Sequence, residues 1–318
     1  MTDTLTPASS QAAEPASLPE AMVLTPHVAL GRVAMLVNPM AGGVGAGAVQ
    51  EAEALLSAYA CEASVVALEA GRFDDQIREA LDARPDVLFV LAGDGTAGTV
   101  ASRAGPDGPL VAPLPGGTMN MLPKALYGTA DWKAALKVAL EQGAAQTVAG
   151  GIVEGHAFYC AAILGSPALW APAREAMRAG KLSLAWTYAR RALKRAFTGR
   201  LRYALDGAPD RRAEALVLIS PMISKAMDED IGLEAAAMNP SDAAEAFRLA
   251  AHAVFDDWRR DPSVRTVPAR RIKVRARSRI PSVIDGEPFL LDAECEVKFI
   301  RHAFRALAPA PASAEDGV

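Results

Sequence analysis

The stretch VLFVLAGDGTAGTVAS, residues 87–102, decides the architecture of the first part of the chain. Five apolar residues, 87–91, run directly into the sequence GDGT at 93–96, and a segment of small residues with helical character follows. A short continuous apolar run is typical of a strand that is buried on both faces of a parallel sheet. An acid between two glycines at the end of such a strand suggests a ligand site if other glycine-rich turns converge there.

Apolar runs and helical patterns alternate between residues 30 and 150. The expected strands lie at 32–38, 63–69 and 86–93 and within 109–117, and the expected helices at 48–60, 73–83 and 130–143. This alternation predicts an α/β N-terminal domain with a parallel sheet that is covered on both faces. In such sheets ligands bind beyond the carboxyl ends of the strands.

The pattern changes after about residue 150. A hairpin is expected around Glu154-Gly155-His156, further strand candidates follow, and helices are expected at about 174–197 and 241–258. The strand candidates predict a β-rich, antiparallel C-terminal domain. The expected limits are 30–150 for the first domain, 151–289 for the second, and 1–29 and 309–318 for disordered tails.

Three glycine-rich turns follow expected strands of the first domain: VNPMAGGVGAG at 37–47, AGDGTAGT at 92–99 and LPGGTMN at 114–120. Glycine lets the backbone approach a ligand closely, and successive amide N–H groups at a helix N-terminus bind anions such as phosphate. A single glycine-rich turn is weak evidence, because many parallel strands end in such a turn for structural reasons alone. Three at one edge of a sheet favour a polyphosphate ligand.

Two common nucleotide motifs do not explain these turns. The Walker pattern G-x-x-x-x-G-K-[ST] is absent. The dinucleotide pattern G-x-G-x-x-G also fits poorly, because GGVGAG at 42–47 orders its glycines differently and only Glu69 could be the acid after the second strand. Hydride chemistry is therefore less favoured, although the residues do not exclude it.

Composition narrows the class of protein. The chain has 318 residues and a formal net charge of -4, which argues against a general nucleic-acid binder. Its cysteines, Cys61, Cys160 and Cys295, form no C-x-x-C pair and are expected to be reduced. No apolar run is long enough to span a bilayer, and the N-terminal residues lack the pattern of a secretory signal. We therefore expect a cytoplasmic protein.

Four motifs occur in the order found in the diacylglycerol kinase catalytic-domain family: NPMAGG at 38–43, AGDGT at 92–96, PGGTMN at 115–120 and IDGE at 284–287. The chain resembles this family, which also includes sphingosine, ceramide and bacterial lipid kinases, over about residues 30–308. GDGT alone is shared with NAD kinases and phosphofructokinases, so the set of four motifs is the more specific signal. The resemblance implies transfer of the γ-phosphoryl group of ATP, with Mg²⁺, to a lipid hydroxyl.

The resemblance also implies where the site lies. The first domain binds the nucleotide, the second is a β-sandwich that binds the acceptor, and the active site lies in the cleft between them. The last strand or helix, about 290–308, is then expected to return to the first domain. The nucleotide-binding positions carried over from the family are Asn38, Gly42, Gly93, Gly95, Thr96, Gly116, Gly117, Thr118 and Asn120.

Three acids are the implied catalytic residues: Asp94, Asp285 and Glu287. Asp94 could hold Mg²⁺ directly or through water, because hard cations prefer carboxylate and water oxygens. The family's general base is proposed to lie in D-G-E, so Asp285 could accept the proton of the attacking hydroxyl, with Glu287 assisting or binding metal. By itself, however, an Asp-Gly pair between strands is more often a hairpin turn.

The chain departs from the family pattern at several positions. Ala41 replaces the usual serine of the first motif, Ala92 replaces the first glycine of G-G-D-G-T, and Met121 replaces the aspartate that often follows the asparagine of the third motif. The frequent Asn-Glu pair after G-D-G-T is also missing at 97–99. With fewer polar side chains, more of the binding is expected to come from backbone amides.

Two charged segments have alternative interpretations. Asp228, Glu229 and Asp230 could hold a structural Mg²⁺, as in some bacterial members of the family, although a solvated turn is the favoured explanation. The basic segment 174–202 has apolar residues at helical spacing. It could lie on an anionic membrane surface, at the inner face of the membrane, or pack as an ordinary helix with a charged solvent face.

The leading hypothesis is thus an ATP-dependent lipid kinase with diacylglycerol, a sphingoid base or ceramide as the acceptor. One alternative is a kinase of a soluble acceptor such as NAD, through the shared G-D-G-T. Another is a nucleotide-binding regulatory protein that has lost turnover, which the missing polar positions would explain. The expected partners are ATP, a lipid alcohol and an anionic membrane surface, with no nucleic acid.

Overall fold

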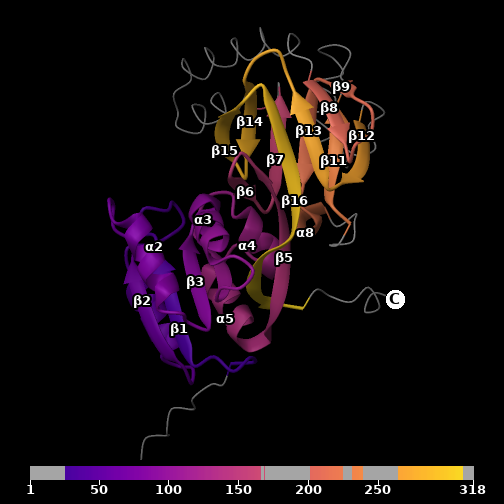
Figure 1. Cartoon of the computed structure of the whole chain (residues 1–318). Coiled ribbons are helices and arrows are strands. Elements are labelled where there is room, and N and C mark those ends of the chain that lie inside the picture. The colour runs from indigo at the N-terminus through magenta and orange to yellow at the C-terminus, as the bar shows by residue number, and fades with distance from the viewer. Residues whose placement is uncertain (1–25, 166–167, 169–200, 225–230, 239–263, 311–318) are drawn as a thin grey trace, which may run out of the picture.

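A computed structural model of the chain describes residues 26–165, 168, 201–224, 231–238 and 264–310. Figure 1 shows an α/β part formed by N-terminal residues and a β-rich part formed mostly by C-terminal residues. The α/β part contains β1 (Arg32–Val37), α1 (Ala48–Leu56), β2 (Glu62–Ala67), α2 (Phe73–Asp82), β3 (Val87–Ala92), α3 (Asp94–Ala104), β4 (Leu110–Pro115), α4 (Met121–Tyr127) and α5 (Trp132–Gln142).

The β-rich part consists of short strands and one described short helix. Its elements are β5 (Gly143–Val153), β6 (His156–Phe158), β7 (Ala161–Gly165), β8 (Leu201–Leu205), β9 (Arg211–Ala213), β10 (Ala215–Ile219), α8 (Pro221–Ser224), β11 (Leu233–Met238), β12 (Val264–Ala269), β13 (Arg271–Arg275), β14 (Ile280–Ile284), β15 (Glu287–Leu291) and β16 (Glu294–Pro309).

The first four strands form the parallel portion of a ten-stranded sheet, in the order β2-β1-β3-β4. β1 lies in the middle, where Val33 pairs with Ala63 of β2 on one side and with Val87 of β3 on the other. The chain therefore moves outward in opposite directions from β1. In open parallel sheets such a switch point, at the carboxyl ends of the strands, is where ligands bind.

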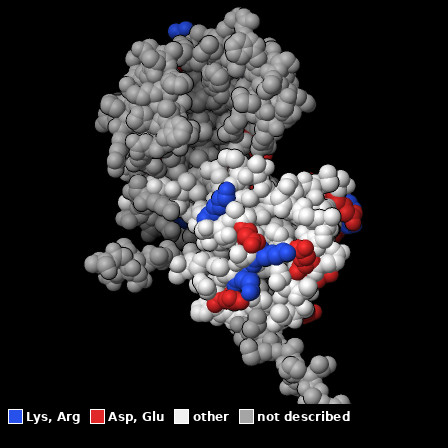
Figure 2. Space-filling model, turned by 180° about the vertical axis from the view of Figure 1, so that it is seen from behind, with Lys and Arg blue, Asp and Glu red and all other residues white. Residues whose placement is uncertain are grey.

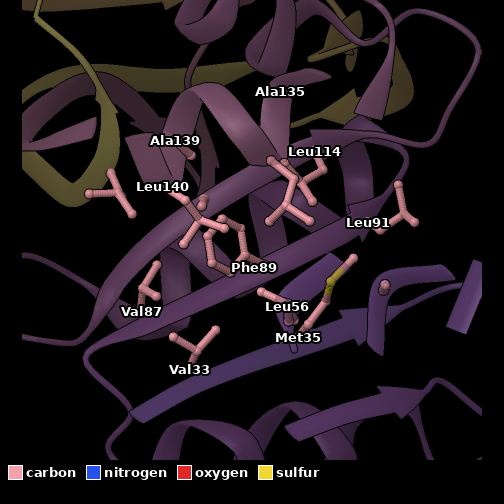
Figure 3. Close-up of a cluster of buried hydrophobic side chains, with 14 of the residues drawn as sticks. Val33, Met35, Leu56, Val87, Phe89, Leu91, Leu114, Ala135, Ala139 and Leu140 are labelled. Carbon is pink, nitrogen blue, oxygen red and sulfur yellow. The ribbon is translucent and has the colours of Figure 1, made fainter. Parts of the chain in front are cut away.

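Both faces of β3, in the interior of this parallel sheet, are buried, which explains the continuous apolar run at 87–91. Phe89 of β3 packs with Leu56 of α1 and Leu140 of α5 on one face (Figure 3). Leu88 belongs to the cluster on the other face, together with Val100 of α3. Because each strand residue contacts either one helix layer or the other, the strand contains no polar side chain.

The β-rich part is built from two antiparallel layers. One is a six-stranded sheet in the order β12-β11-β10-β7-β14-β15, and the other is formed by β16, β13, β8 and β9 of the larger sheet. Buried side chains from both layers form one cluster, for example Leu164 of β7, Leu218 of β10 and Ile272 of β13. The predicted fold class, an α/β domain with a parallel sheet followed by a β-rich sandwich, is confirmed.

The last strand connects the two parts. β16 pairs in parallel with β4 through Ala306 and Val111, and antiparallel with β13 through Val297 and Ile272. β5 runs beside β16 along most of its length. The ten-stranded sheet therefore passes through both parts, and β16 belongs to each of them. For the rest of the chain we propose 30–150 and 151–289 as the limits of the two domains.

Charges of both signs lie close together on the outside of the molecule. Figure 2 shows Lys and Arg interspersed with Asp and Glu over the described part of the face turned away from the viewer of Figure 1. Pairs such as Arg78 with Asp75 and Lys133 with Glu51 are in contact. The described part of the face in Figure 2 therefore has no large patch of only positive or only negative charge.

Candidate active site

The three glycine-rich turns meet at the carboxyl edge of the parallel sheet. The N–H of Asn38, after β1, donates to the carbonyl of Leu91 in β3 at 2.9 Å. The N–H of Gly43 donates to the carbonyl of Gly116 at 2.9 Å, and the N–H of Gly116 donates to the carbonyl of Ala92 at 3.0 Å. The turns after β1, β3 and β4 are thus hydrogen-bonded to one another and form one surface.

Some glycines in these turns are required for the turns to pack together. A Cβ added to Gly117 would lie 2.7 Å from the Cα of Gly93, closer than side chains approach. A Cβ added to Gly43 would lie 3.1 Å from the carbonyl oxygen of Gly116. Gly42 is different, because it is exposed and a Cβ there would lie 3.9 Å from Oγ1 of Thr118, itself exposed. Part of the glycine content therefore serves packing between turns.

The GDGT sequence at 93–96 is the start of a helix rather than a separate turn. Gly93 alone connects β3 to α3, which begins at Asp94, and no side chain caps its first turn. The first N–H groups of a helix have no intrahelical acceptor, so those of Asp94, Gly95 and Thr96 are oriented for an anion. The start of α3 thus presents N–H groups without an intrahelical acceptor at the position where the sequence predicts phosphate binding.

Asp94 is half-buried at this helix start. Its Oδ1 accepts a hydrogen bond from the N–H of Leu122 in α4 at 3.2 Å. Its Oδ2 has no hydrogen-bond partner among the described residues. One carboxylate oxygen is therefore held by the protein backbone while the other remains available to a ligand or a cation.

The two asparagines predicted to bind nucleotide are held by nearby backbone. Asn120 is buried in a left-handed conformation with φ of 51°. Its Oδ1 accepts from the N–H of Gly117 at 2.7 Å, and its Nδ2 donates to the carbonyl of Gly117 at 2.9 Å. Oδ1 of half-buried Asn38 accepts from the N–H of Met40 at 3.0 Å. In this structure both side chains shape the turns.

The acids of D-G-E lie in a hairpin turn between β14 and β15. Asp285 and Gly286 have φ of 43° and 91°, so this is the left-handed type of turn favoured by Asp-Gly. The carboxylate of Asp285 accepts from the N–H groups of Tyr159 at 2.7 Å and of Cys160 and Ala161 at 2.9 Å each. Burial raises the pKa of Asp285, the three N–H groups oppose that rise, and the negative charge of Asp94 adds to it.

Glu287, at the start of β15, is exposed. Its Oε1 lies 3.9 Å from the position that a Cβ on Gly95 would occupy, next to the first turn of α3. Among the described residues, no group donates a hydrogen bond to its carboxylate. The chain thus brings Asp285 and Glu287, from the β-rich part, beside Asp94 of the α/β part.

Lys124 is a charged residue of the site that the sequence did not indicate. It is exposed on α4, and its Nζ donates to the carbonyl of Met119, in the third glycine-rich turn, at 3.0 Å. One available signal was its position four residues after Asn120, one helical turn into the helix that the turn opens. The residues 159–161 that hold Asp285 were also missed, because they carry no sequence motif.

Several predicted features lie outside the described residues. They are the acids Asp228, Glu229 and Asp230, the basic segment with its expected helix up to residue 200, the expected helix at about 241–258, and most of the two expected tails. In the part of the chain that the structure describes, no three His, Cys, Asp or Glu side chains gather as metal ligands. No described helix has the length and apolarity needed to cross a bilayer.

The α/β part of the chain is similar to a known protein family. Residues 32–151 match the family model described as "Diacylglycerol kinase catalytic domain". The resemblance predicted from the motifs is therefore confirmed for this part of the chain. No curated protein sequence matches the chain.

Several solved structures have the same fold. A diacylglycerol kinase from Bacillus anthracis str. Sterne is similar with a TM-score of 0.63 at 16% identity, covering 88% of this chain and 98% of that chain. Two further structures from that organism, described as proposed diacylglycerol kinases, have TM-scores of 0.67 at 18% and 19% identity. They cover 88% of this chain and 98% and 97% of their own chains. At these identities the likeness shows the fold alone.

Proposed function

We propose that this chain, in which residues 32–151 match the diacylglycerol kinase catalytic domain, is an ATP-dependent lipid kinase. It would transfer the γ-phosphoryl group to the hydroxyl of diacylglycerol, a sphingoid base or ceramide. One observation carries the proposal: the carboxylates of D-G-E lie beside Asp94 and the helix start at 93–96. Phosphoryl transfer needs such positioning and charge compensation more than covalent help from the protein.

The phosphate side of the site supports ATP as the donor. Free N–H groups at the start of α3 and the turns at 37–47 and 114–120 face one edge of the sheet. Lys124 adds a positive charge beside the third turn. Since the side chains missing at Ala41 and Met121 cannot contribute hydrogen bonds, these amides and Lys124 are proposed to bind the polyphosphate.

Asp94 is the described residue that fits a magnesium ion carried by ATP. Its Oδ2 has no described partner, and Mg²⁺ characteristically binds through one or two carboxylates together with substrate phosphates and water. When bound, Mg²⁺ supplies charge neutralisation at the β- and γ-phosphates. The absence of a larger ligand cluster among the described residues is compatible with such a shared site.

An apolar sheet face supports a lipid acceptor. Val283 of β14, Ile163 of β7, Val217 of β10 and Ala236 of β11 pair in one row across the six-stranded sheet. Their strand neighbours point into the core between the two layers, so this row points to the opposite face. The next pair towards the D-G-E turn is also apolar, Ala161 with Ile219, and Ala161 contacts Asp285. Val283, Ala236 and Ile219 are buried, whereas Ile163 and Val217 are half-buried. We propose that the hydrocarbon of the acceptor contacts this face at Ile163 and Val217.

The proposed function is tested by incubating purified protein with labelled ATP, Mg²⁺ and a panel of acceptors. The panel includes diacylglycerol, sphingosine and ceramide in detergent, and NAD as a soluble acceptor. A labelled lipid phosphate is the expected product. Labelled NADP instead would support the soluble acceptor, and ATP binding without any product would support a regulatory protein.

Replacing Lys124 with methionine, which keeps the length of the side chain and removes the charge, is expected to weaken ATP binding about tenfold. Hydrogen bonds to charged groups contribute about 1.5–3 kcal/mol, and about 1.4 kcal/mol corresponds to tenfold. AMP binding should change little, because AMP lacks the distal phosphates. Calorimetric titration with ATP, ADP and AMP measures the difference.

The matched control is Lys133→Met, since Lys133 of α5 pairs with Glu51 of α1 at 2.8 Å and makes no hydrogen bond to the glycine-rich turns among the described contacts. It should bind all three nucleotides like the wild-type protein. An equal loss of ATP and AMP affinity in Lys124→Met would mean that Lys124 only supports the carbonyl of Met119.

Replacing Val217 with threonine is expected to raise the KM for a lipid acceptor by roughly tenfold while the KM for ATP stays unchanged. Burying an unpaired hydroxyl against hydrocarbon costs about 1–3 kcal/mol. Steady-state kinetics with dispersed lipid check this. Ala204→Thr, on the outer face of β8 in the other layer, is the control, and an equal effect there would argue against the proposed acceptor face.

A further inference from the structure

A pocket of about 360 Å³ lies in the β-rich part of the molecule. Its lining includes Asp206 and Gly207, in the hairpin turn between β8 and β9, and Arg270, Arg271 and Lys273, at the start of β13. β8 and β9 end the ten-stranded sheet on the side away from the parallel strands, as Figure 1 shows. The pocket is therefore separate from the glycine-rich turns and from the D-G-E turn.

Strand alternation places the basic residues of β13 on the outer face of their layer. Ile272 and Val274 of this strand are buried in the core between the two layers. The residues that alternate with them, Arg271, Lys273 and Arg275, are exposed on the opposite face. β13 thus presents three positively charged side chains in one row to solvent.

The acid that lies across from Lys273 is occupied by other bases. Glu296 of β16 pairs with Lys273 in the register of the sheet. Its carboxylate instead contacts Arg271 at 3.7 Å and Lys298 at 3.4 Å. The charge of Lys298 offsets that of Glu296, so this acid does not reduce the net charge beside the pocket. The ammonium group of Lys273 has no ion-pair or hydrogen-bond partner among the described residues.

The hairpin turn fixes the wall of the pocket. Oδ1 of Asp206 accepts from the N–H groups of Arg270 at 3.0 Å and Arg271 at 2.8 Å. The N–H of Asp206 donates to the carbonyl of Arg271 at 2.9 Å. Nε of Arg270 donates to the carbonyl of Ile231 at 3.0 Å, which orients its guanidinium group. A wall that is ordered before a ligand arrives lowers the entropy cost of binding.

The charge of the pocket matches a doubly negative ligand. Among the described lining residues, Arg270, Arg271 and Lys273 are positive and Asp206 is negative, which leaves a formal charge of +2. A phosphomonoester carries a charge of about -1.5 to -2 at neutral pH and has three strong acceptor oxygens. Guanidinium groups bind phosphate through two parallel N–H groups, and lysine binds it as a point charge. A carboxylate would compensate only half of this charge.

We propose that this pocket binds a phosphomonoester group, an inference that does not depend on the proposed kinase function. Lys273 supplies a charge without a described partner, and Arg271 supplies the forked N–H groups. Asp206 positions the backbone of Arg271 and does not contact the ligand. The same chemical group occurs on small molecules in water and on the headgroup of a lipid phosphate, and the test distinguishes these two sources.

The first arm is calorimetric titration of the full chain with glycerol 3-phosphate. A saturating non-hydrolysable ATP analogue with Mg²⁺ is present, so that the candidate active site is occupied. Lys273→Met is expected to weaken binding by about tenfold or more, because it removes one charged contact to the ligand. Lys273→Arg keeps the charge and should bind nearly as the wild-type protein does. Both variants should unfold at the wild-type temperature, because Lys273 is exposed.

Lys298→Met is the matched control, because it removes the same charge from the same face of the neighbouring strand β16. It should bind glycerol 3-phosphate within about threefold of wild type, since exposed ion pairs such as that of Lys298 with Glu296 contribute little.

The second arm is co-sedimentation with phosphatidylcholine vesicles that contain either phosphatidic acid or phosphatidylglycerol at matched charge. A preference for phosphatidic acid that Lys273→Met removes would assign the pocket to a lipid headgroup. Binding of glycerol 3-phosphate without that preference would assign it to a phosphomonoester free in water. Either result supports the site.

Three results would overturn the inference. The wild-type protein could bind neither probe, or Lys273→Met could bind both as the wild-type protein does. Lys298→Met could also lose as much affinity as Lys273→Met, which would mean that the whole face attracts anions and the pocket has no special role. Because no turnover is measured, the outcome is independent of whether the chain phosphorylates a lipid.

Discussion

Replacing Asp94 with asparagine is expected to lower turnover by about a hundredfold or more while leaving the protein folded, because losing one key electrostatic contact typically costs that much. The asparagine side chain would keep an oxygen that accepts from the N–H of Leu122, so the contact between α3 and α4 would survive. It would lose the negative charge that we propose for the Mg²⁺ of ATP. Steady-state kinetics with Mg²⁺ and circular dichroism on the same preparation measure both properties.

The expected change in stability for Asp94→Asn is small. An acid in the first turn of a helix contributes about 0.3–1 kcal/mol through the helix dipole. Asp107→Asn is the control, because Asp107 is exposed beyond the C-terminal end of α3 and makes no contact with the glycine-rich turns among those described. Near-normal turnover in a folded Asp94→Asn protein would rule out the proposed role of this carboxylate.

Replacing Gly117 with alanine is expected to weaken nucleotide binding and to destabilise the protein. The added Cβ would lie 2.7 Å from the Cα of Gly93 and 3.3 Å from Oδ1 of Asn120. Since the first of these contacts is with backbone, the turn after β4 must move away from the start of α3. Forcing extra atoms into a packed site costs about 1–3 kcal/mol in the free energy of unfolding.

The separation of the two turns should weaken ATP binding by at least about tenfold, the loss that corresponds to about 1.4 kcal/mol. Isothermal titration and thermal unfolding measure the two effects. Gly45→Ala is the matched control within the first turn, because nothing lies within 4 Å of a Cβ at that position. If Gly117→Ala binds ATP like Gly45→Ala, the close packing of the turns is not what organises the site.

The parallel sheet could be predicted closely because its signal is local. The apolar run at 87–91 predicted a strand, and β3 covers Val87–Ala92 with every residue buried. The start of the next helix was harder to predict, since GDGT was expected to form a turn and instead begins α3 at Asp94. Small residues allow several backbone conformations, so their pattern does not define where a helix starts.

The contacts of each predicted site residue were much harder to predict from the sequence. Asp285 was expected to face an acceptor hydroxyl, and nothing local indicated that residues 159–161 would donate to it. These donors lie 124 to 126 positions earlier in the chain. They meet Asp285 only because β14 pairs with β7. Lys124 was missed for a related reason, since its contact with Met119 depends on how α4 leaves the third turn.

The sequence by itself determined which segments are buried, which turns are rich in glycine and which acids lie in or next to these turns. Apolar periodicity and the conformational freedom of glycine are properties of short stretches, so they can be read from the sequence. The tertiary structure decided which turns touch, since the strand order β2-β1-β3-β4 places the turns at 37–47, 93–96 and 114–120 side by side. It also decided that the lone pairs of Asp285 face backbone N–H groups while those of Glu287 remain open. Hydrogen-bond partners from distant strands determine such properties, and no short stretch of sequence contains them.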